Sequence, residues 1–195
     1  WYAIRIRKHD TYTGQFVYTL DEETTYNGTD YPLGFYSAAM VRPAVNDARY
    51  FTRLTKSSYG YYWQLPNGRY VQNGKPVSGV GESSVTVGYE EKNGFVLKGG
   101  SYYFVPYLLG GAYFIGETSS AGRAYYDLYP ISLAEAGLTV WQVVSDGAPE
   151  TARVSCKRSD VSGLTSVYNK GYFFLPTGVV PEAGDFSMPG SKEVT

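Results

Sequence analysis

The chain has 195 residues, and its 17 basic and 18 acidic residues give a formal net charge of −1. This length suits one well-cored domain, or one domain and the start of another. The balanced charge and the lack of a Lys or Arg stripe argue against a nucleic-acid partner. The longest apolar stretches, such as Tyr102–Leu109, fall far short of the roughly 20 residues that cross a bilayer as a helix, so no membrane insertion is expected.

Tyrosine, glycine and proline set the character of the sequence. It contains 21 Tyr, 23 Gly and 10 Pro, and 43% of its residues are hydrophobic. Aromatic and β-branched residues fit the half-buried surface of a pleated sheet, whereas Gly, Pro and Asn favour turns. This mixture predicts many short strands joined by tight connections, and therefore an all-β fold.

The first predicted element is a strand over Tyr2–Arg7, where apolar and polar side chains alternate at period two. Its residues Tyr2, Ile4 and Ile6 fall on one face. After a polar, glycine-containing turn, Gln15–Leu20 is predicted to be the second strand of a hairpin.

Two further hairpins are predicted along the chain. Tyr61–Gln72 is interrupted by Asn67-Gly68, the strongest short hairpin signal, because both residues tolerate positive φ. Tyr103–Gly116 is interrupted in the same way by Gly110-Gly111. Both segments therefore predict two strands around a glycine turn.

The three hairpins suggest an internal repeat. Each has an aromatic-led strand, a turn glycine (Gly14, Gly68 or Gly111) and a second strand with an aromatic residue before Val, Phe or Ile. Each is also followed by a later aromatic strand, namely Tyr50–Leu54, Gly94–Lys98 and Val140–Val144. We interpret the pattern as three degenerate repeats of about 45 to 50 residues.

One short helical turn is predicted over Ser132–Leu138, because Ser132 and Glu135 have the spacing of a capping box. The composition then shifts after Gly147, where Ala148–Glu150 indicates a boundary. We therefore expect two parts.

The predicted parts are a first domain over residues 1–147 and a β appendage over residues 148–195. Strands are expected within the appendage over Ala152–Lys157 and Tyr172–Leu175. The stretch from Pro176 is rich in Pro, Gly and acids, and it is interpreted as a linker toward a removed domain.

Side chains for common catalytic and metal sites are scarce. The sequence has one histidine, His9, and one cysteine, Cys156, so no Cys/His or Ser/His/Asp constellation and no tetrahedral zinc site is expected. Paired carboxylates could serve glycoside hydrolysis. The acids available for such a pair are Asp21, Glu22, Glu23, Glu90 and Glu91. Adjacent acids in turns more often solvate a loop, so no catalytic residue, metal or cofactor is predicted.

The three degenerate repeats described above, each with an aromatic-led strand, a glycine turn and a later aromatic strand, resemble the ricin-B-like β-trefoil. The residues that carry the likeness are Thr13–Val17, Asn67–Val71 and Gly111–Ile115, although the Gln-x-Trp signature of that family is absent from all three repeats. The resemblance implies a β-trefoil-like fold, sugar binding and a role as an accessory module of secreted enzymes and toxins. A jelly-roll β-sandwich is the alternative fold, because many short strands with regular turn signals also fit it.

The resemblance also implies where a sugar would bind. In sugar-binding trefoils an acidic residue after the first strand acts with an aromatic residue and a later Asn, and the first repeat offers each type. The implied carbohydrate site consists of Asp10, Tyr12, Tyr31, Tyr36, Asn46 and Asp47. The alternative interpretation is that the tyrosines only pack the core and half-cover the sheet.

Taken together, these features predict a non-catalytic carbohydrate-binding or adhesive accessory module, secreted or at the cell surface. Its expected partners are a glycan or glycoprotein and other domains of the same precursor. Tyr172–Pro176 and Asp185-Phe186 resemble segments that precede further domains in large bacterial surface proteins. A structural spacer domain and, third, a small glycoside hydrolase are the alternative functions.

Overall fold

A computed structural model of the chain describes residues 1–42, 46–72, 75–77, 85–119 and 122–187. Its regular structure consists of β-strands and two short 3-10 turns, Ala48–Tyr50 (η1) and Ala183–Asp185 (η2), which confirms the predicted all-β class. The strands are, in chain order, β1 (Tyr2–Lys8), β2 (Val17–Tyr26), β3 (Thr29–Phe35), β4 (Phe51–Ser57), β5 (Gly60–Gln64), β6 (Tyr70–Gln72), β7 (Lys75–Val77), β8 (Val85–Glu90), β9 (Gly94–Gly99), β10 (Tyr102–Leu109), β11 (Ala112–Thr118), β12 (Tyr125–Pro130), β13 (Leu138–Gln142), β14 (Arg153–Cys156), β15 (Ser166–Tyr168), β16 (Tyr172–Pro176) and β17 (Phe186–Ser187).

Six strands pair in a closed ring. The order around the ring is β1, β4, β5, β8, β9, β12 and back to β1, and every pair is antiparallel. The longest uninterrupted register among them joins β8 to β9, from Val85↔Gly99 to Glu90↔Gly94. Because each ring strand has a partner on both sides, the backbone groups of its two edges are at least partly hydrogen-bonded.

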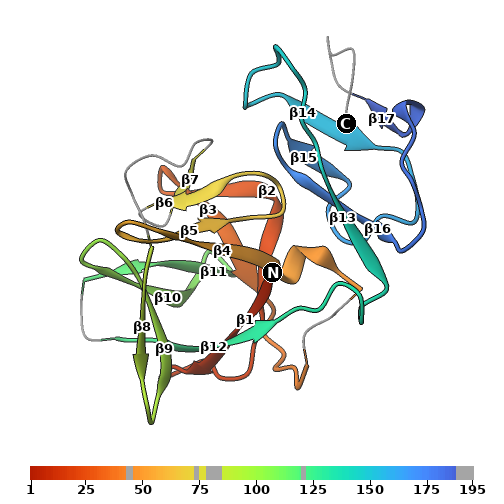
Figure 1. Cartoon of the computed structure of the whole chain (residues 1–195). Helices are drawn as coiled ribbons and strands as arrows, with labels where there is room; N and C mark the ends of the chain where they lie inside the picture. The colour runs from red at the N-terminus through yellow and green to blue at the C-terminus, as the bar shows by residue number, and fades with distance from the viewer. Residues whose placement is uncertain (43–45, 73–74, 78–84, 120–121, 188–195) are drawn as a thin grey trace.

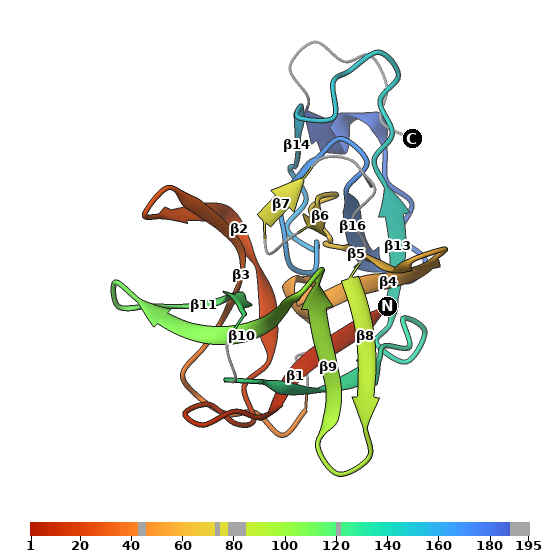
Figure 2. The same cartoon turned by 90° about the vertical axis from the view of Figure 1, so that its left-hand side faces the viewer.

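Three hairpins leave the ring at regular points. The β2–β3 hairpin lies between β1 and β4 in the chain, β6–β7 between β5 and β8, and β10–β11 between β9 and β12. The hairpins meet, since β11 pairs with β3 at Phe114↔Gly34 and β7 lies against β3. Figure 2 shows β2–β3 beside β10–β11. The chain therefore passes three times through a ring strand, a hairpin and a second ring strand.

The main core fills the space between the ring and the hairpins. Its largest fully buried side chains include Phe35, Trp63, Phe104 and Tyr126. The rings of Trp63 and Phe104 meet edge to face with centroids 5.2 Å apart. The hydroxyl of Tyr126 donates to the carbonyl of Phe104 at 2.9 Å, which satisfies the polar end of a fully buried tyrosine. Burial of each such side chain contributes about 1.5 to 3 kcal/mol.

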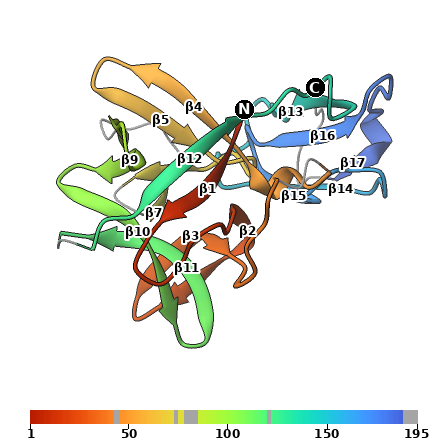
Figure 3. The same cartoon turned by 90° about the horizontal axis from the view of Figure 1, so that it is seen from below.

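The C-terminal strands pack beside the ring (Figures 1 and 3). Strand β13 pairs with β16, and β14 pairs with β15 and β17. Ala3 and Phe51 of the ring share a second core cluster with Phe174 of β16, whereas Ile4 and Ile6 face the main core. The period-two alternation predicted for the first strand is thus confirmed, and both faces of β1 are used.

Hydrogen bonds tie the C-terminal strands to the β5–β6 turn. The carbonyls of Pro66 and Asn67 accept from the backbone N–H groups of Tyr172 and Tyr168, at 2.8 and 2.9 Å. The hydroxyl of Tyr172 also bonds the side-chain oxygen of Gln64 at 3.0 Å. Separation of the C-terminal strands from the ring would break all three bonds.

Two of the three predicted hairpins are confirmed, as β5–β6 and β10–β11. At the tip of β10–β11, Gly110 and Gly111 both have positive φ, 57° and 84°. In the other turn Gly68 has a φ of 90°, while Asn67 uses its side-chain oxygen to accept from the N–H of Arg69 at 3.0 Å. This is the local bond by which Asn stabilises turns without a positive φ of its own.

The first predicted hairpin forms only next to its turn. The start of Gln15–Leu20 meets β1 through the Arg5↔Phe16 bridge. Farther along, β2 pairs with β3, and β1 pairs with β12 and β4. The prediction that β1 and β2 pair with each other is therefore wrong for most of their length.

The predicted repeat goes out of register at the end of its second copy and stays so in its third. The first two hairpin predictions span β1–β2 and β5–β6, but the third spans β10–β11. Of the later aromatic strands, Tyr50–Leu54 falls on β4, Gly94–Lys98 on β9, and Val140–Val144 begins on β13, which pairs with β16 outside the ring. Aromatic residues occur in all six ring strands and in most hairpin strands, so their pattern cannot distinguish one strand of a unit from the next.

The predicted helical turn is confirmed as one turn. The N–H of Ala136 donates to the carbonyl of Ser132 at 3.0 Å, and the N–H of Glu135 donates to the Ser132 hydroxyl at 3.3 Å. Gly137 follows with a φ of 68°, as expected for the residue that ends a helical turn.

The division into residues 1–147 and 148–195 stays a prediction. Strand β13 before that boundary pairs with β16 after it. The strands predicted over Ala152–Lys157 and Tyr172–Leu175 are confirmed as β14 and β16. The stretch interpreted as a linker forms η2 and β17 up to Ser187, and residues 188–195 lie outside the described residues.

Candidate functional site

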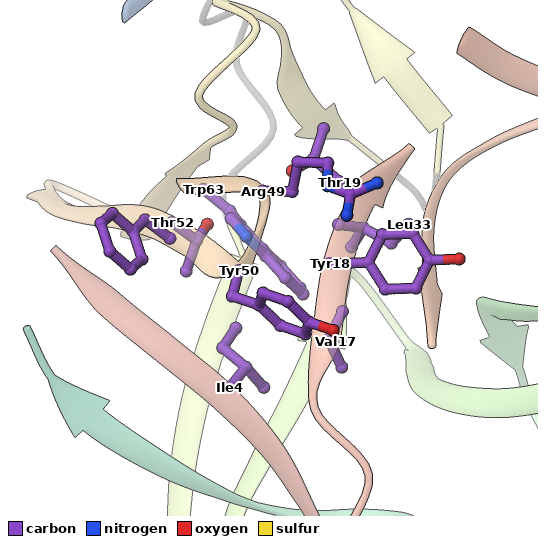
Figure 4. A pocket seen from close by; sticks show the side chains of 10 residues that line it. Ile4, Val17, Tyr18, Thr19, Leu33, Arg49, Tyr50, Thr52 and Trp63 are labelled. Carbon is purple, nitrogen blue, oxygen red and sulfur yellow. The ribbon is translucent and has the colours of Figure 1, made fainter. Parts of the chain in front are cut away.

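Among the described residues, a first hollow lies where the main core meets the second core cluster near η1. Ile4, Val17, Tyr50 and Trp63 are among the side chains around it (Figure 4), and its volume is about 10 Å³. The indole Nε1 of Trp63 has no hydrogen-bond partner in the described part of the chain. A space of this size holds about one water molecule at most, so it cannot accept a sugar.

The second hollow is an apolar mouth of the ring, with a volume of about 320 Å³. All six ring strands contribute to its lining, which consists of Tyr2, Leu54, Tyr61, Val87, Phe95, Leu128 and Pro130. Ligand sites combine apolar walls with a few placed polar groups. Among the described residues, the side chains of its lining offer two tyrosine hydroxyls as their polar groups, so this mouth fits a sugar poorly.

The third hollow, which we name the tyrosine cleft, lies on the β8–β9 hairpin and the start of β10. Its volume is about 190 Å³, and its lining consists of Thr86, Gly88, Tyr89, Glu90, Val96, Lys98, Tyr103 and Arg123. The β8–β9 hairpin projects from the ring in Figures 1 and 2. The registers Thr86↔Lys98 and Lys98↔Tyr103 place these three residues side by side on adjacent strands. Directly opposed residues share one face of a sheet, which explains how they come to line one cleft.

Two cations lie close to the ring of Tyr103 in this cleft. The Lys98 ammonium is 4.3 Å from the centroid of its ring, and the Arg123 guanidinium carbon is 4.9 Å from it. Cation–π attraction of this kind restrains an aromatic ring at a surface. A hydrogen bond with Lys98 is the main cause that lowers the pKa of the Tyr103 hydroxyl below its ordinary value.

Glu90 is the acid of the tyrosine cleft. Its carboxylate accepts from the Asn93 side chain at 3.0 Å and from Arg123 at 3.4 Å. Hydrogen bonds from Asn93 and from Tyr125 keep the pKa of Glu90 below its ordinary value, so the group is ionised at neutral pH. The cleft thus offers an aromatic ring, hydrogen-bonding groups and charges of both signs.

Of the six residues predicted to bind carbohydrate, the structure brings Tyr36 and Asp47 together around Arg49. Asp47 forms an ion pair with Arg49 at 2.7 Å, and the Arg49 guanidinium lies 5.6 Å from the centroid of the Tyr18 ring. Tyr18 in turn stacks on Tyr36, with centroids 4.7 Å apart. Burial is the main cause that raises the pKa of Tyr18 to about 12. The carboxylate of Asp47 is therefore engaged within the chain.

Asp10 and Tyr12 lie in the turn after β1. Asp10 is exposed, whereas Tyr12 is half-buried and packs edge-on against Phe35 with centroids 5.0 Å apart. Tyr12 also meets Tyr113 of β11, at 5.9 Å. Its ring thus contributes to the packing of the hairpins.

Tyr31 and Asn46 lie elsewhere. The ring of Tyr31 on β3 stacks on Phe114 of β11 with centroids 5.1 Å apart. Asn46 is exposed beside η1, and its carbonyl accepts from the Ser162 hydroxyl at 2.7 Å. A first-repeat carbohydrate site that uses all six residues stays a prediction.

The sequence reasoning did not find the tyrosine cleft. Glu90 was considered only as one of several acids for a carboxylate pair. The period-two pattern of β8 places Thr86, Gly88 and Glu90 on one face, and this signal is readable in the sequence. Arg123 comes from the segment before β12, and no sequence pattern connects it to that face.

Glu117 on β11 is a second unusual acid, and it does not line the tyrosine cleft. Its Oε1 is buried without a hydrogen-bond partner among the described residues. Desolvation raises the pKa of Glu117 to about 7, against a smaller opposing attraction from Lys75. The ionised form is thus disfavoured in the folded chain.

We expect Glu117→Gln to stabilise the protein at pH 8 and to leave it unchanged at pH 4. An acid whose pKa is higher in the folded than in the unfolded chain adds to the free energy of unfolding. This contribution is fully present below the unfolded pKa of 4.5 and is lost as the pH rises through the folded pKa of about 7. Because the side chain keeps part of its exposure, we expect about 1 to 2 kcal/mol at pH 8. Urea unfolding at both pH values measures the difference. An equal effect at both would contradict the account.

Within the described residues, no helix is long and apolar enough to cross a bilayer. The same part of the chain holds no group of three His, Cys, Asp or Glu side chains placed to bind a metal ion. Comparison of the chain with protein-family models, with curated proteins and with solved structures found no match.

Proposed function

We propose that this chain is a non-catalytic carbohydrate-binding module that holds a glycan in the tyrosine cleft. A glycan or glycoprotein is the proposed partner. We further propose that the module is secreted or displayed at a cell surface as an accessory part of a larger bacterial protein. The fold alone does not establish a function, so the proposal depends on the residues of the cleft.

The proposed fold of the ring and its hairpins is β-trefoil-like. Three passes through a ring strand, a hairpin and a ring strand support this fold, as does the meeting of β3 with β7 and β11. In a jelly-roll sandwich, by contrast, two separate sheets would pack face to face. The closed pairing order from β1 through β12 fits the trefoil better.

One observation carries the functional proposal: Lys98 and Arg123 both contact the ring of Tyr103 in an open cleft that also presents Glu90 and Thr86. A pyranose ring has an apolar face that stacks on aromatic side chains, and its hydroxyls need hydrogen-bond partners. The cleft supplies both. Because the ring is already restrained, little side-chain entropy is lost on binding.

The first-repeat residues offer a second candidate location for the same function. Tyr36 is 46% exposed and stacks on Tyr18, so its outer face is open to a ligand. The side chain of Asp47, however, forms an ion pair with Arg49, and it caps η1 by accepting from the backbone N–H of Arg49 at 3.0 Å. The tyrosine cleft has the better set of available groups.

We expect Tyr103→Ala to weaken glycan binding by at least about tenfold, because loss of a stacking ring removes about 1 to 3 kcal/mol. The matched control is Tyr102→Ala, since Tyr102 precedes Tyr103 on β10, is 49% exposed and does not line the cleft. The measurement is an array of neutral, uronate-bearing and sulfated glycans, followed by calorimetric titration of the strongest binder.

Tyr102→Ala is expected to bind as the unaltered protein does. A lack of binding to every glycan class would overturn the proposed function and favour a structural spacer. Binding that is lost in Tyr36→Ala but retained in Tyr103→Ala would move the site to the first repeat.

A further inference from the structure

The charges around the tyrosine cleft differ from those of the chain as a whole. The chain carries a formal net charge of −1, but two cations, Lys98 and Arg123, line the cleft with one acid, Glu90. Lys8 adds a third positive charge, because its ammonium donates to the Asn93 side chain, which itself bonds Glu90. The surface of the cleft is therefore positive.

Neighbouring charges do not cancel this excess. Glu91 and Lys92 follow each other in the exposed β8–β9 turn and offset one another. Asp127 on β12 forms ion pairs with Arg7 at 3.3 Å and with Arg5 at 3.7 Å, so its charge is compensated on the β1 side.

Both cations of the cleft have bonding capacity left. Lys98 interacts with Tyr103 and forms no ion pair with a carboxylate of the described residues. Arg123 donates through one terminal nitrogen to Glu90 at 3.4 Å and also hydrogen-bonds the Tyr125 hydroxyl. A guanidinium has five N–H donors in a planar fork, so several remain for a ligand.

The ion pair with Glu90 shows that Arg123 is placed to contact a carboxylate in this cleft. An anionic substituent on a sugar that contacts the Tyr103 ring would lie near both Lys98 and Arg123, because both cations lie within 5 Å of the ring centroid. Hydrogen bonds from a cation to an anionic oxygen are about twice as strong as those between neutral groups.

We infer that the tyrosine cleft selects glycans that carry an anionic group, a carboxylate or a sulfate, over neutral glycans. This inference rests on the proposed carbohydrate-binding function and adds the class of ligand to it. Because Lys98 and Arg123 are partly exposed, their attraction to the ligand is screened, and the selectivity falls as ionic strength rises.

The test compares three hexasaccharides by calorimetric titration at low salt: oligogalacturonate with carboxylates only, a carrageenan fragment with sulfates only, and neutral maltohexaose. We expect at least one anionic ligand to bind at least about tenfold more tightly than maltohexaose. Lys98→Gln and Arg123→Gln should each reduce that preference several-fold. The two anionic arms distinguish a carboxylate from a sulfate.

Lys92→Gln is the matched control, because it removes the same charge from the adjacent turn without altering the lining of the cleft. It should keep the preference. Equal affinity for neutral and anionic ligands, or a preference that survives both cleft substitutions, would overturn the inference while the proposed function stands. The absence of binding to all three ligands and to every glycan of the array would overturn both the inference and the proposed function.

Discussion

Substitution of Gly68 by Ala should destabilise the protein by about 3 kcal/mol or more, a loss found where backbone strain and overpacking combine. Gly68 has a φ of 90°, which an L side chain rarely adopts. A Cβ at this position would lie 2.7 Å from the backbone nitrogen of Gly171 and 2.8 Å from its Cα. Backbone atoms cannot rotate away, so the β5–β6 turn and the C-terminal strands would have to move apart.

The matched control for this prediction is Gly100→Ala. Gly100 also has a positive φ, 60°, but a Cβ there would meet nothing within 4 Å. The control should therefore lose only the conformational part, about 1 kcal/mol. Denaturant unfolding of both variants measures the two losses, and equal losses would show that the C-terminal strands do not press on the β5–β6 turn.

Trp63→Ala should cost about 3 to 5 kcal/mol, the usual range for removal of a large aromatic side chain from a core. Trp63 is 1% exposed and packs edge to face on Phe104, at the level of the small interior hollow. Its removal would enlarge that hollow into a cavity bounded by the ring strands, which can close only partly.

Trp63→Phe separates volume from polarity at the same position. The indole N–H has no partner among the described residues, and its removal relieves an unsatisfied buried donor. We therefore expect a loss of no more than about half that of the Ala variant. Thermal and urea unfolding measure both variants. An equally large loss for Phe would show that the indole N–H is hydrogen-bonded in solution.

Local patterns in the sequence predicted single elements better than their partners. Alternation placed Ile4 and Ile6 on the core face of β1, and paired glycines located the β10–β11 turn. Pairing depends on the path of the whole chain. Nothing in Tyr2–Arg7 indicates that its partners are β12 and β4 rather than the strand that follows it.

The repeat illustrates the same limit. A β-rich chain uses aromatic residues in ring strands, hairpins and appendage alike. The aromatic pattern therefore makes Gly94–Lys98 equivalent to Tyr50–Leu54, but Tyr50–Leu54 falls on β4, which ends a pass, and Gly94–Lys98 forms β9, which begins one. Its cross-strand neighbours, on β8, β10 and β12, decide its place in the ring. These neighbours are known only once the chain has folded.

The two candidate sites differ in the same way, because one joins residues of a single predicted repeat and the other joins residues that meet only in the folded chain. Tyr36 and Asp47 were selected from one repeat, and they do approach each other through Tyr18 and Arg49. The tyrosine cleft, in contrast, combines β8, β9, β10 and the segment before β12. Such a site depends on three-dimensional contacts such as that between Arg123 and the Tyr103 ring, at 4.9 Å.

An NMR titration of the isotope-labelled protein with the strongest glycan of the array tests the proposed site most directly. The account predicts saturable shifts of the backbone amides of Lys98, Tyr103 and Arg123, with little change at Tyr36 and Asp47. Shifts centred on Tyr36 and Asp47 would contradict the tyrosine cleft as the binding site, and a spectrum unchanged at saturating glycan would contradict carbohydrate binding itself.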